Sequence, residues 1–198
     1  MDRTYTDKTK IEELLKETID RDLDDIILMV QQYIENQTNR IFQPCDDASI
    51  RYFNGNGKSI LDIDECVEIT KVENGNDYYG DTFTEILSTG DTRYYAEPYN
   101  ELPIDRIRLR GELWTKGKKN IRITAKWGYS EEVPFDIVWV ATYLSAMFYK
   151  QQTNVAGGVQ SETIGSYTVS FSLDAMISGL SEKNKIMEIL NKNKRYEF

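Results

Sequence analysis

The sequence feature that most constrains the fold is an uncharged, aromatic-rich run within residues 134–152. Pro134 suits the first position of a helix, because its missing N–H would have no partner there. Between Asp136 and Lys150 the run carries no charge, and its apolar residues cover most of a helix circumference. A bilayer span needs roughly 20 apolar residues, which is more than this run offers. We therefore expect a core helix that is covered on most sides, and no membrane partner.

The segments around this helix predict an α+β chain. Helical spacing predicts N-terminal helices, the second capped by Thr18 or Asp20, and a C-terminal helix capped by Ser181. Between the N-terminal helices and the central one, the hydrophobic period changes to two and turn residues become dense, which is typical of antiparallel strands. The predicted fold is N-terminal helices, an antiparallel β region, a long central apolar helix and a C-terminal helix. In a single domain over 1–198, the parts are helices at 1–40, a β-rich region at 49–128, the central helix at 133–152, and a mobile loop, late strand and C-terminal helix at 153–198.

A hairpin is predicted at the start of the β region. Ser49 to Phe53 and Lys58 to Ile63 flank the tetrapeptide Asn54-Gly55-Asn56-Gly57. Asn and Gly accept the positive φ that tight hairpin turns need. Glu65 to Glu73 reads as a separate strand that follows the hairpin.

Composition removes several classes of chemistry. With no histidine in 198 residues, the imidazole-dependent catalytic arrangements and histidine-ligated zinc are excluded. Cys45 and Cys66 lack CxxC spacing, which argues against a disulfide framework or a zinc–cysteine site. We expect no cofactor and no bound metal. The net charge of −9 argues against a surface that is basic throughout, and the absence of an N-terminal apolar run predicts a cytoplasmic protein.

Two strands predict a cationic ladder. In Ile104 to Arg110, Ile107 and Leu109 share one face and three arginines share the other, and Asn120 to Gly128 alternates in the same way. If these strands pair antiparallel, five cations line the outward face, with Lys116, Lys118 and Lys119 in the connecting turn. Like charges that face each other across a sheet cost stability. An acidic face of a neighbouring subunit or a phosphate backbone would cover the ladder; otherwise it is a solvated face. The ladder residues are Arg106, Arg108, Arg110, Arg122 and Lys126.

A late strand is predicted after the loop that follows the central helix. Tyr167, Val169, Phe171 and Leu173 alternate with small polar residues, which gives a strand with one apolar face. An isolated strand must pair with something. We expect it to join the earlier sheet or the sheet edge of another subunit.

An acidic cluster offers an enzymatic alternative. Asp62, Asp64, Glu65 and Glu68, followed by Lys71, could hold Mg²⁺ in a metal-dependent phosphodiesterase. However, Glu68 and Lys71 have opposite parity on the predicted strand, so they would face opposite ways. A structural role is the better interpretation, and we expect no catalytic residues. A third alternative is a monomeric nucleic-acid-binding module that acts through the ladder and its lysine turn.

The order of these segments resembles the head-tail connector proteins of tailed bacteriophages, also called adaptor or head-completion proteins. The resemblance covers most of the chain, from two N-terminal helices through the β region ending in NIRITAKWGYS to VPFDIVWVATYLSAMFY and SETIGSYTVSFS. Its local signatures are Trp127-Gly128-Tyr129 before the Pro134 helix and Ile164-Gly165-Ser166-Tyr167 before the late strand. The stretch Asn74 to Leu102 is enlarged relative to a compact β part.

The resemblance implies a structural protein of the virion neck, assembled in the host cytoplasm. Such proteins form a dodecameric ring beneath the portal protein, offer a platform for a tail or stopper protein, and have no active site. Phage DNA would pass through the ring during packaging and ejection without sequence-specific binding. On this view, the ladder and the late strand form a subunit or portal interface away from the channel. The interface residues are Arg106, Arg108, Arg110, Arg122, Lys126, Tyr167, Val169 and Phe171.

Overall fold

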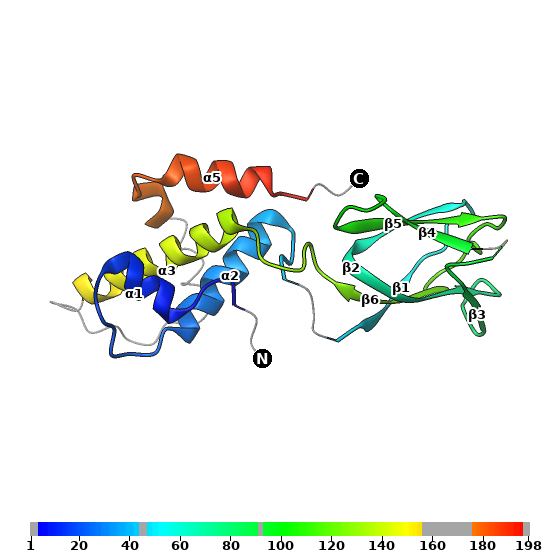
Figure 1. Cartoon of the computed structure of the whole chain (residues 1–198), viewed down its shortest axis with the longest axis horizontal. Coiled ribbons are helices and arrows are strands. Elements are labelled where there is room, and N and C mark those ends of the chain that lie inside the picture. Colours follow the sequence, from blue (N-terminus) through cyan, green and yellow to red (C-terminus); the bar gives the residue numbers. More distant parts are fainter. Residues whose placement is uncertain (1–3, 44–46, 91–92, 156–175, 196–198) are drawn as a thin grey trace. The chain divides into compact units, whose positions relative to one another are not determined.

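The computed structural model describes residues 4–43, 47–90, 93–155 and 176–195 (Figure 1). The chain divides into two compact units, which we call the helical unit (residues 1–40 and 133–198) and the sheet unit (residues 41–132). The α+β class predicted from the sequence is confirmed, whereas a single domain over 1–198 stays a prediction. The helices are α1 (Lys8–Leu15), α2 (Asp24–Thr38), α3 (Phe135–Val155) and α5 (Lys183–Lys192). The strands are β1 (Ser49–Phe53), β2 (Ile60–Gly75), β3 (Phe83–Ile86), β4 (Arg93–Glu97), β5 (Ile104–Arg110) and β6 (Ile121–Trp127).

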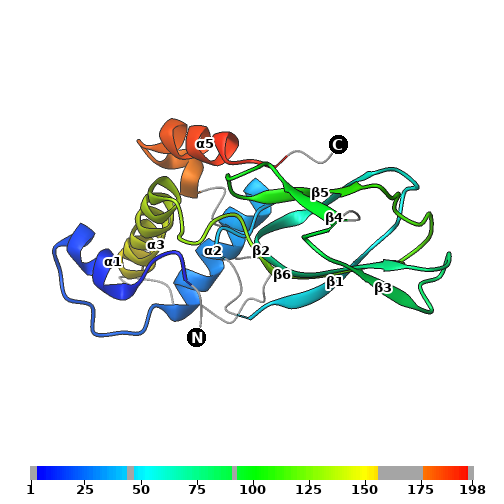
Figure 2. The ribbon, with the colours of Figure 1, turned by 45° about the vertical axis from the view of Figure 1, so that its right-hand side comes forward.

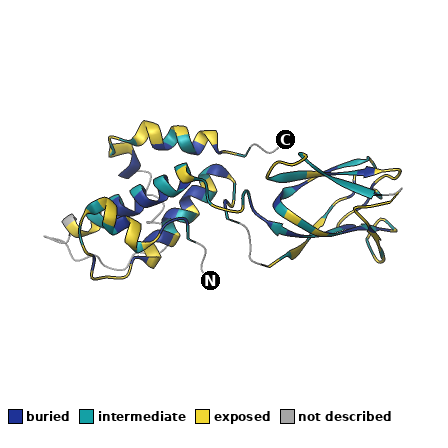
Figure 3. Ribbon diagram, in the orientation of Figure 1, coloured by how far each residue is buried: buried dark blue, intermediate teal, exposed yellow. Residues whose placement is uncertain are grey.

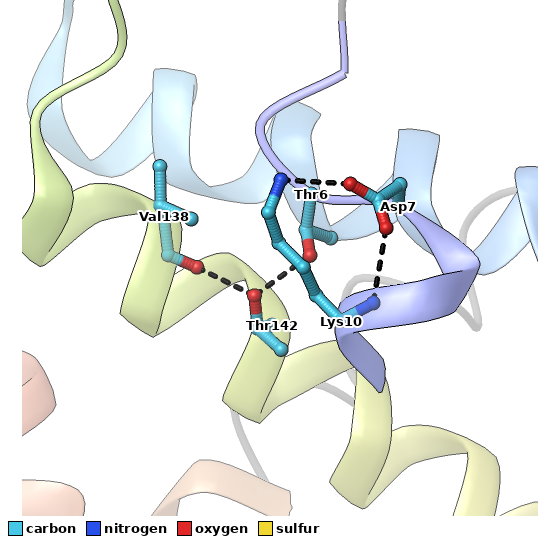
Figure 4. Close-up of polar contacts among 5 residues, drawn as sticks. All are labelled: Thr6, Asp7, Lys10, Val138 and Thr142. Carbon is cyan, nitrogen blue, oxygen red and sulfur yellow. Dashed lines mark hydrogen bonds and ion pairs between the residues drawn. The ribbon is translucent and has the colours of Figure 1, made fainter. Parts of the chain in front are cut away.

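The helical unit is built around contacts of α3 with α1, α2 and α5. Asp7 caps α1 by accepting a hydrogen bond from the Lys10 backbone N–H at 3.0 Å. Beside this cap, a buried hydroxyl pair joins the start of the chain to α3, with 2.7 Å between Thr6 Oγ1 and Thr142 Oγ1 (Figure 4). Thr142 donates its own hydrogen to the Val138 carbonyl, so Thr6 is the donor to Thr142. The hydroxyls of both threonines are therefore satisfied although they lie in the core.

The expected long central apolar helix is not evident as such. Ile137, Val140 and Leu144 of α3 are fully buried, but Phe135 at its start is 86% exposed. Gln151, Gln152 and Thr153 near its C-terminal end are polar and exposed, and the helix continues to Val155, past the predicted end at 152. It also cannot organise the whole chain, because the sheet unit has a hydrophobic core of its own. None of the helices in the described ranges is long and apolar enough to cross a membrane.

Two predicted helix starts were wrong. Lys16 adopts a left-handed conformation that ends α1, and α2 then begins only at Asp24 rather than after Thr18 or Asp20. The connecting segment is fixed instead by Glu12, whose carboxylate accepts the Ile19 N–H at 2.8 Å. At the other end of the chain, α5 begins at Lys183, two residues after the expected Ser181 cap.

The sheet has the strand order β1-β6-β2-β5-β4, with β3 pairing with the far end of β2 (Figure 2). All the pairs are antiparallel, as expected. Strand β2 runs through both predicted segments as one 16-residue strand, and register shifts mark β-bulges along it. Bulges bend a strand and increase its twist. This explains how β2 pairs with β6 on one side and with β5 and then β3 on the other.

The predicted hairpin at Asn54 to Gly57 was wrong. Strand β1 pairs with β6, in the register Ser49 opposite Ala125 and Phe53 opposite Ile121. The turn residues instead make contacts across the end of the sheet unit, described below. At the opposite end, the two termini of the sheet unit are hydrogen-bonded to each other, since the Tyr129 N–H donates to the Ile41 carbonyl at 2.9 Å.

The core of the sheet unit follows the predicted alternation. On β5 and β6, Ile107, Leu109, Ile121, Ile123, Ala125 and Trp127 are buried, and the residues between them are more exposed. Figure 3 shows this burial along the strands. Trp127 also donates its indole N–H to the Ser49 carbonyl at 2.8 Å. Alternation with a period of two thus sets which side chain of each strand enters the core.

Candidate interaction surfaces

The predicted cationic ladder does not form, because β5 and β6 do not pair. Strand β2 lies between them and pairs with both. In this register, Asp62 of β2 lies opposite Arg106, and Glu68 and Glu73 lie opposite Lys126 and Arg122. That the strand between the cations supplies carboxylates to them was not predicted from the sequence. The alternation of acidic and apolar residues in β2 was the signal that could have shown it.

The strongest of these pairs joins Glu73 and Arg122. Arg122 Nε and Nη2 donate to the two carboxylate oxygens at 2.7 and 2.6 Å, a bidentate geometry. Lys71 adds a second cation at 2.9 Å from Glu73, and the Arg122 guanidinium lies over the Phe83 ring at 4.4 Å from its centroid. The Glu73 side chain is only 7% exposed. This cluster therefore ties β2, β3 and β6 together with a nearly buried ion pair.

The hydrogen bond from Arg122 holds the pKa of Glu73 at about 2, well below its ordinary value of 4.5. The same contact raises the pKa of Arg122, and the hydrogen bond to Glu73 raises that of Lys71. All three groups are therefore charged throughout the physiological pH range.

The other ladder cations also have partners within the sheet unit. Lys126 pairs with Glu68 at 2.7 Å, and Arg108 with Glu97 at 2.6 Å. Arg106 contacts its neighbour Asp105 at 3.2 Å. The Tyr95 hydroxyl interacts with Arg110 as well as Arg93, and these hydrogen bonds lower its pKa against the effect of burial. Four of the five ladder cations are therefore neutralised by carboxylates of the same unit, and Arg110 contacts a tyrosine hydroxyl. The remaining predicted interface residues, Tyr167, Val169 and Phe171, lie outside the described residues.

The acidic residues considered for a metal site are not brought together. Asp64 pairs with Arg51 at 2.7 Å, whereas Glu68 pairs with Lys126, and Lys71 faces Glu73. Within the ranges that the structure describes, no group of three potential metal-ligating side chains is found. Cys66 is fully buried, and burial raises the pKa of its thiol to about 12, so it is neither a thiolate nucleophile nor a ready ligand at neutral pH.

A different surface lies at one end of the sheet unit, where three loops meet. We call it the loop end and define it as residues 54–58, 76–82 and 113–120. Its centre is Asn120, which is fully buried. The Asn120 side chain accepts the Gly55 N–H at 2.9 Å and donates to the carbonyls of Thr115 and Asp77 at 2.7 and 3.2 Å. One amide thus links all three loops.

Close backbone packing completes the loop end. The Gly117 N–H donates to the Gly55 carbonyl at 3.0 Å, and the Lys118 N–H donates to the Tyr78 carbonyl at 2.9 Å. A Cβ atom on Gly55 would lie 1.8 Å from the Thr115 carbonyl oxygen, so only glycine fits there. The Asn54 to Gly57 tetrapeptide, taken for a hairpin turn, is needed for this contact between loops.

The loop end carries unneutralised positive charge. Lys58, Lys116, Lys118 and Lys119 are all exposed, and none forms an ion pair with another described residue. Of its two carboxylates, Asp77 accepts the N–H groups of Tyr79, Gly80 and Asp81, which lowers its pKa. Three of these lysines were predicted from the sequence to lie in one connecting turn. Lys58 was not grouped with them, because the wrong hairpin placed it on a strand.

A third surface feature is a groove of about 420 Å³ along β4. Strand β4 pairs with β5 only, so it is an edge of the described sheet. The groove lining is mainly aromatic and aliphatic. It includes Tyr94, Tyr95, Tyr99, Leu102 and Ile104.

Comparisons with known proteins show a likeness in fold. No known family matches the sequence, and no curated protein matches it. A similar solved structure is a chain in "Neck of empty GTA particle computed with C6 symmetry", with a TM-score of 0.55 and 9% sequence identity. The match covers 95% of this chain and 90% of that chain. At this identity the likeness establishes a shared fold, and that fold is found in the neck of a particle.

Proposed function

We propose that this chain is a structural protein of the neck of a tailed-phage-type virion. In this role it forms a ring that joins the portal protein to the tail or stopper protein and lines the channel through which DNA passes. The observation that carries the proposal is the likeness over 95% of the chain to a chain from a particle neck. The resemblance of the segment order to head-tail connectors supports it independently. The proposal assigns the chain no catalytic role and no cofactor.

We infer that the charged face of the sheet contributes to the subunit or portal interface. Arg106 and Arg110 are exposed, so a neighbour can reach them directly. Arg108, Arg122 and Lys126 already hold carboxylates, so a neighbour would extend these pairs into networks rather than supply the first counter-charge. Tyr167, Val169 and Phe171 are proposed to add a strand to a sheet edge of an adjacent subunit.

Native mass spectrometry and negative-stain imaging of the purified chain, alone and with its portal protein, test the ring. A closed ring, dodecameric by the family resemblance, is the expected product in at least one of the two conditions. A chain that stays monomeric even with the portal would overturn the proposal.

Charge reversal at Arg106 and Arg108, made together as Arg106→Glu and Arg108→Glu, tests the interface. We expect ring formation to fall sharply, because reversed charges repel what the arginines attract. Glu188, which is exposed on α5, gives a control through Glu188→Lys. Intact rings from the double variant would remove the sheet face from the interface.

A further inference from the structure

We propose that the loop end binds the phosphate backbone of double-stranded DNA without reading its sequence. The inference rests on the proposed neck function for the source of the DNA. It adds to that function a defined contact site, which is separate from the subunit interface proposed on the sheet face.

Charge partners differ between the strands of the sheet unit and the loop end. Six of the eight cations on the strands have carboxylate partners in the same unit, at 3.2 Å or less in every case, and Arg93 and Arg110 contact the Tyr95 hydroxyl. The loop end instead gathers four exposed lysines against two carboxylates, in a chain of net charge −9. An excess of positive charge that the protein leaves unpaired is the electrostatic footprint expected of a phosphate-binding surface.

The remaining negative charge at the loop end does not neutralise its lysines. Asp77 is occupied by three backbone N–H groups, which fix its carboxylate within its own loop. Asp81 and, just outside the loop end, Glu112 are exposed. These two carboxylates lower the expected affinity but do not form ion pairs with the lysines. A weak and salt-sensitive contact is therefore expected, as suits DNA that must move past the site.

The neighbouring side chains of the loop end also suit phosphate binding. Tyr78 and Tyr79 are 47% and 74% exposed, and their rings meet edge to face at 5.0 Å. Tyrosine hydroxyls and lysine ammonium groups are common donors to phosphate oxygens. Lysine acts as a point charge and lacks the planar fork with which arginine fixes a carboxylate. This composition favours a uniform phosphate backbone over a specific acidic protein surface.

The loop end is preorganised. Lys58 lies on one loop and Lys116 and Lys118 lie on another, and Asn120 and the contacts of Gly55 and Gly117 hold these loops in one arrangement. A Cβ on Gly57 would contact the Lys116 Cβ at 3.6 Å, so the two lysine-bearing loops touch. A charge cluster on a fixed scaffold loses less entropy on binding than one on free loops.

The test is a fluorescence-anisotropy titration of a labelled DNA duplex of arbitrary sequence, at several salt concentrations. The first variant replaces all four loop-end lysines by glutamine, as Lys58→Gln, Lys116→Gln, Lys118→Gln and Lys119→Gln. The matched control makes the same charge change in the helical unit, as Lys8→Gln, Lys16→Gln, Lys183→Gln and Lys194→Gln. Circular dichroism and urea unfolding establish that both variants are folded.

We expect the loop-end variant to bind DNA at least ~10-fold more weakly than the wild type, and the control to change by less than ~2-fold. Each phosphate contact contributes about 0.9 to the salt slope, so the slope should flatten by up to ~3 to 4 in the loop-end variant only. Equal losses in both variants would overturn the proposal, because they would show a general charge effect. Unchanged binding in the loop-end variant would overturn it as well.

A parallel titration with poly-glutamate separates DNA from an acidic protein. Binding of poly-glutamate as tight as that of DNA, lost in the same variant, would replace DNA by an acidic polypeptide as the ligand. The ring assay is read separately on the same variants. If the chain forms rings but the loop-end variant binds DNA as tightly as the wild type, only this inference fails. If the chain binds DNA through the loop-end lysines but forms no ring, only the proposed neck function fails.

Discussion

The charged face of the sheet, which carries the ladder residues, and the loop end belong to the same unit, but their charged side chains have different partners. On the sheet face, cations from β5 and β6 meet carboxylates of β2, β4 and β5 itself, and Glu73 is almost completely enclosed by its partners. At the loop end, the lysines extend into solvent and the hydrogen-bonding capacity of the backbone is used to join loops. Charge therefore stabilises the fold in the first region, and in the second it is available to a ligand.

The largest effect should come from Asn120→Ala, which removes the amide at the centre of the loop end. The substitution leaves the Gly55 N–H and the Thr115 and Asp77 carbonyls without that partner in a buried position. We expect a loss of about 3 kcal/mol in the free energy of unfolding, measured by urea denaturation. The exposed Asn191 provides the control, because Asn191→Ala should change stability by less than about 0.5 kcal/mol. A mild effect of Asn120→Ala would mean that the loops hold together without it.

The next effect separates two ion pairs of the same type on the sheet face. Glu73→Gln leaves Arg122 without its bidentate carboxylate in a nearly buried position, and we expect a loss of about 2 kcal/mol. Glu68→Gln breaks the more exposed pair with Lys126, and we expect less than about 0.5 kcal/mol. Chemical denaturation of both variants checks the contrast. Equal losses would show that burial does not distinguish the two pairs.

A smaller effect should appear as pH dependence. Because the folded-state pKa of Glu73 is about 2 and its ordinary value is 4.5, its stabilisation is complete above about pH 4.5 and is lost as pH falls towards 2. We expect this group to contribute about 1 to 2 kcal/mol after solvent screening is allowed for. Unfolding curves of wild type and Glu73→Gln, recorded between pH 2 and 7, should converge at the acid end. A constant gap between them would contradict the lowered pKa.

The smallest effect should be that of the loop-end lysines on stability. The four-lysine glutamine variant used for DNA binding should change the free energy of unfolding by less than about 1 kcal/mol, because no intramolecular ion pair is lost. Equilibrium denaturation at low and moderate salt measures this. A large loss in the free energy of unfolding would show that these lysines stabilise the fold, as the charges on the face of the sheet do. The two regions would then not differ in this respect.

The sequence predicted local structure well and strand pairing poorly. Alternation identified the buried faces of β5 and β6 correctly, because it depends only on neighbours in the chain. Pairing depends on contacts between distant residues. Strand β1 pairs with β6, which lies about 70 residues later in the sequence, and a local sequence pattern carries no information about such a contact. The hairpin and ladder errors share this cause, since both assumed that strands consecutive in sequence would pair.

The loop end could be predicted only in part for the same reason. Lys116, Lys118 and Lys119 are close in sequence and were predicted to form a basic turn. Lys58 and Tyr78 are distant in sequence and come near them only when the loops fold. Asn120 gave no signal by itself, because one asparagine before a strand is common in turns. Its role depends on three backbone segments that fold together around it.

The hydrogen bond between Tyr129 and Ile41 has a consequence for how the gene can change. The sheet unit enters and leaves the chain at neighbouring backbone positions, which in a paired backbone lie about 5 Å apart. A module with adjoining ends can be excised, exchanged or enlarged while the flanking helices stay joined by a short linker. Insertions can therefore accumulate in this cassette with little effect on the helical unit.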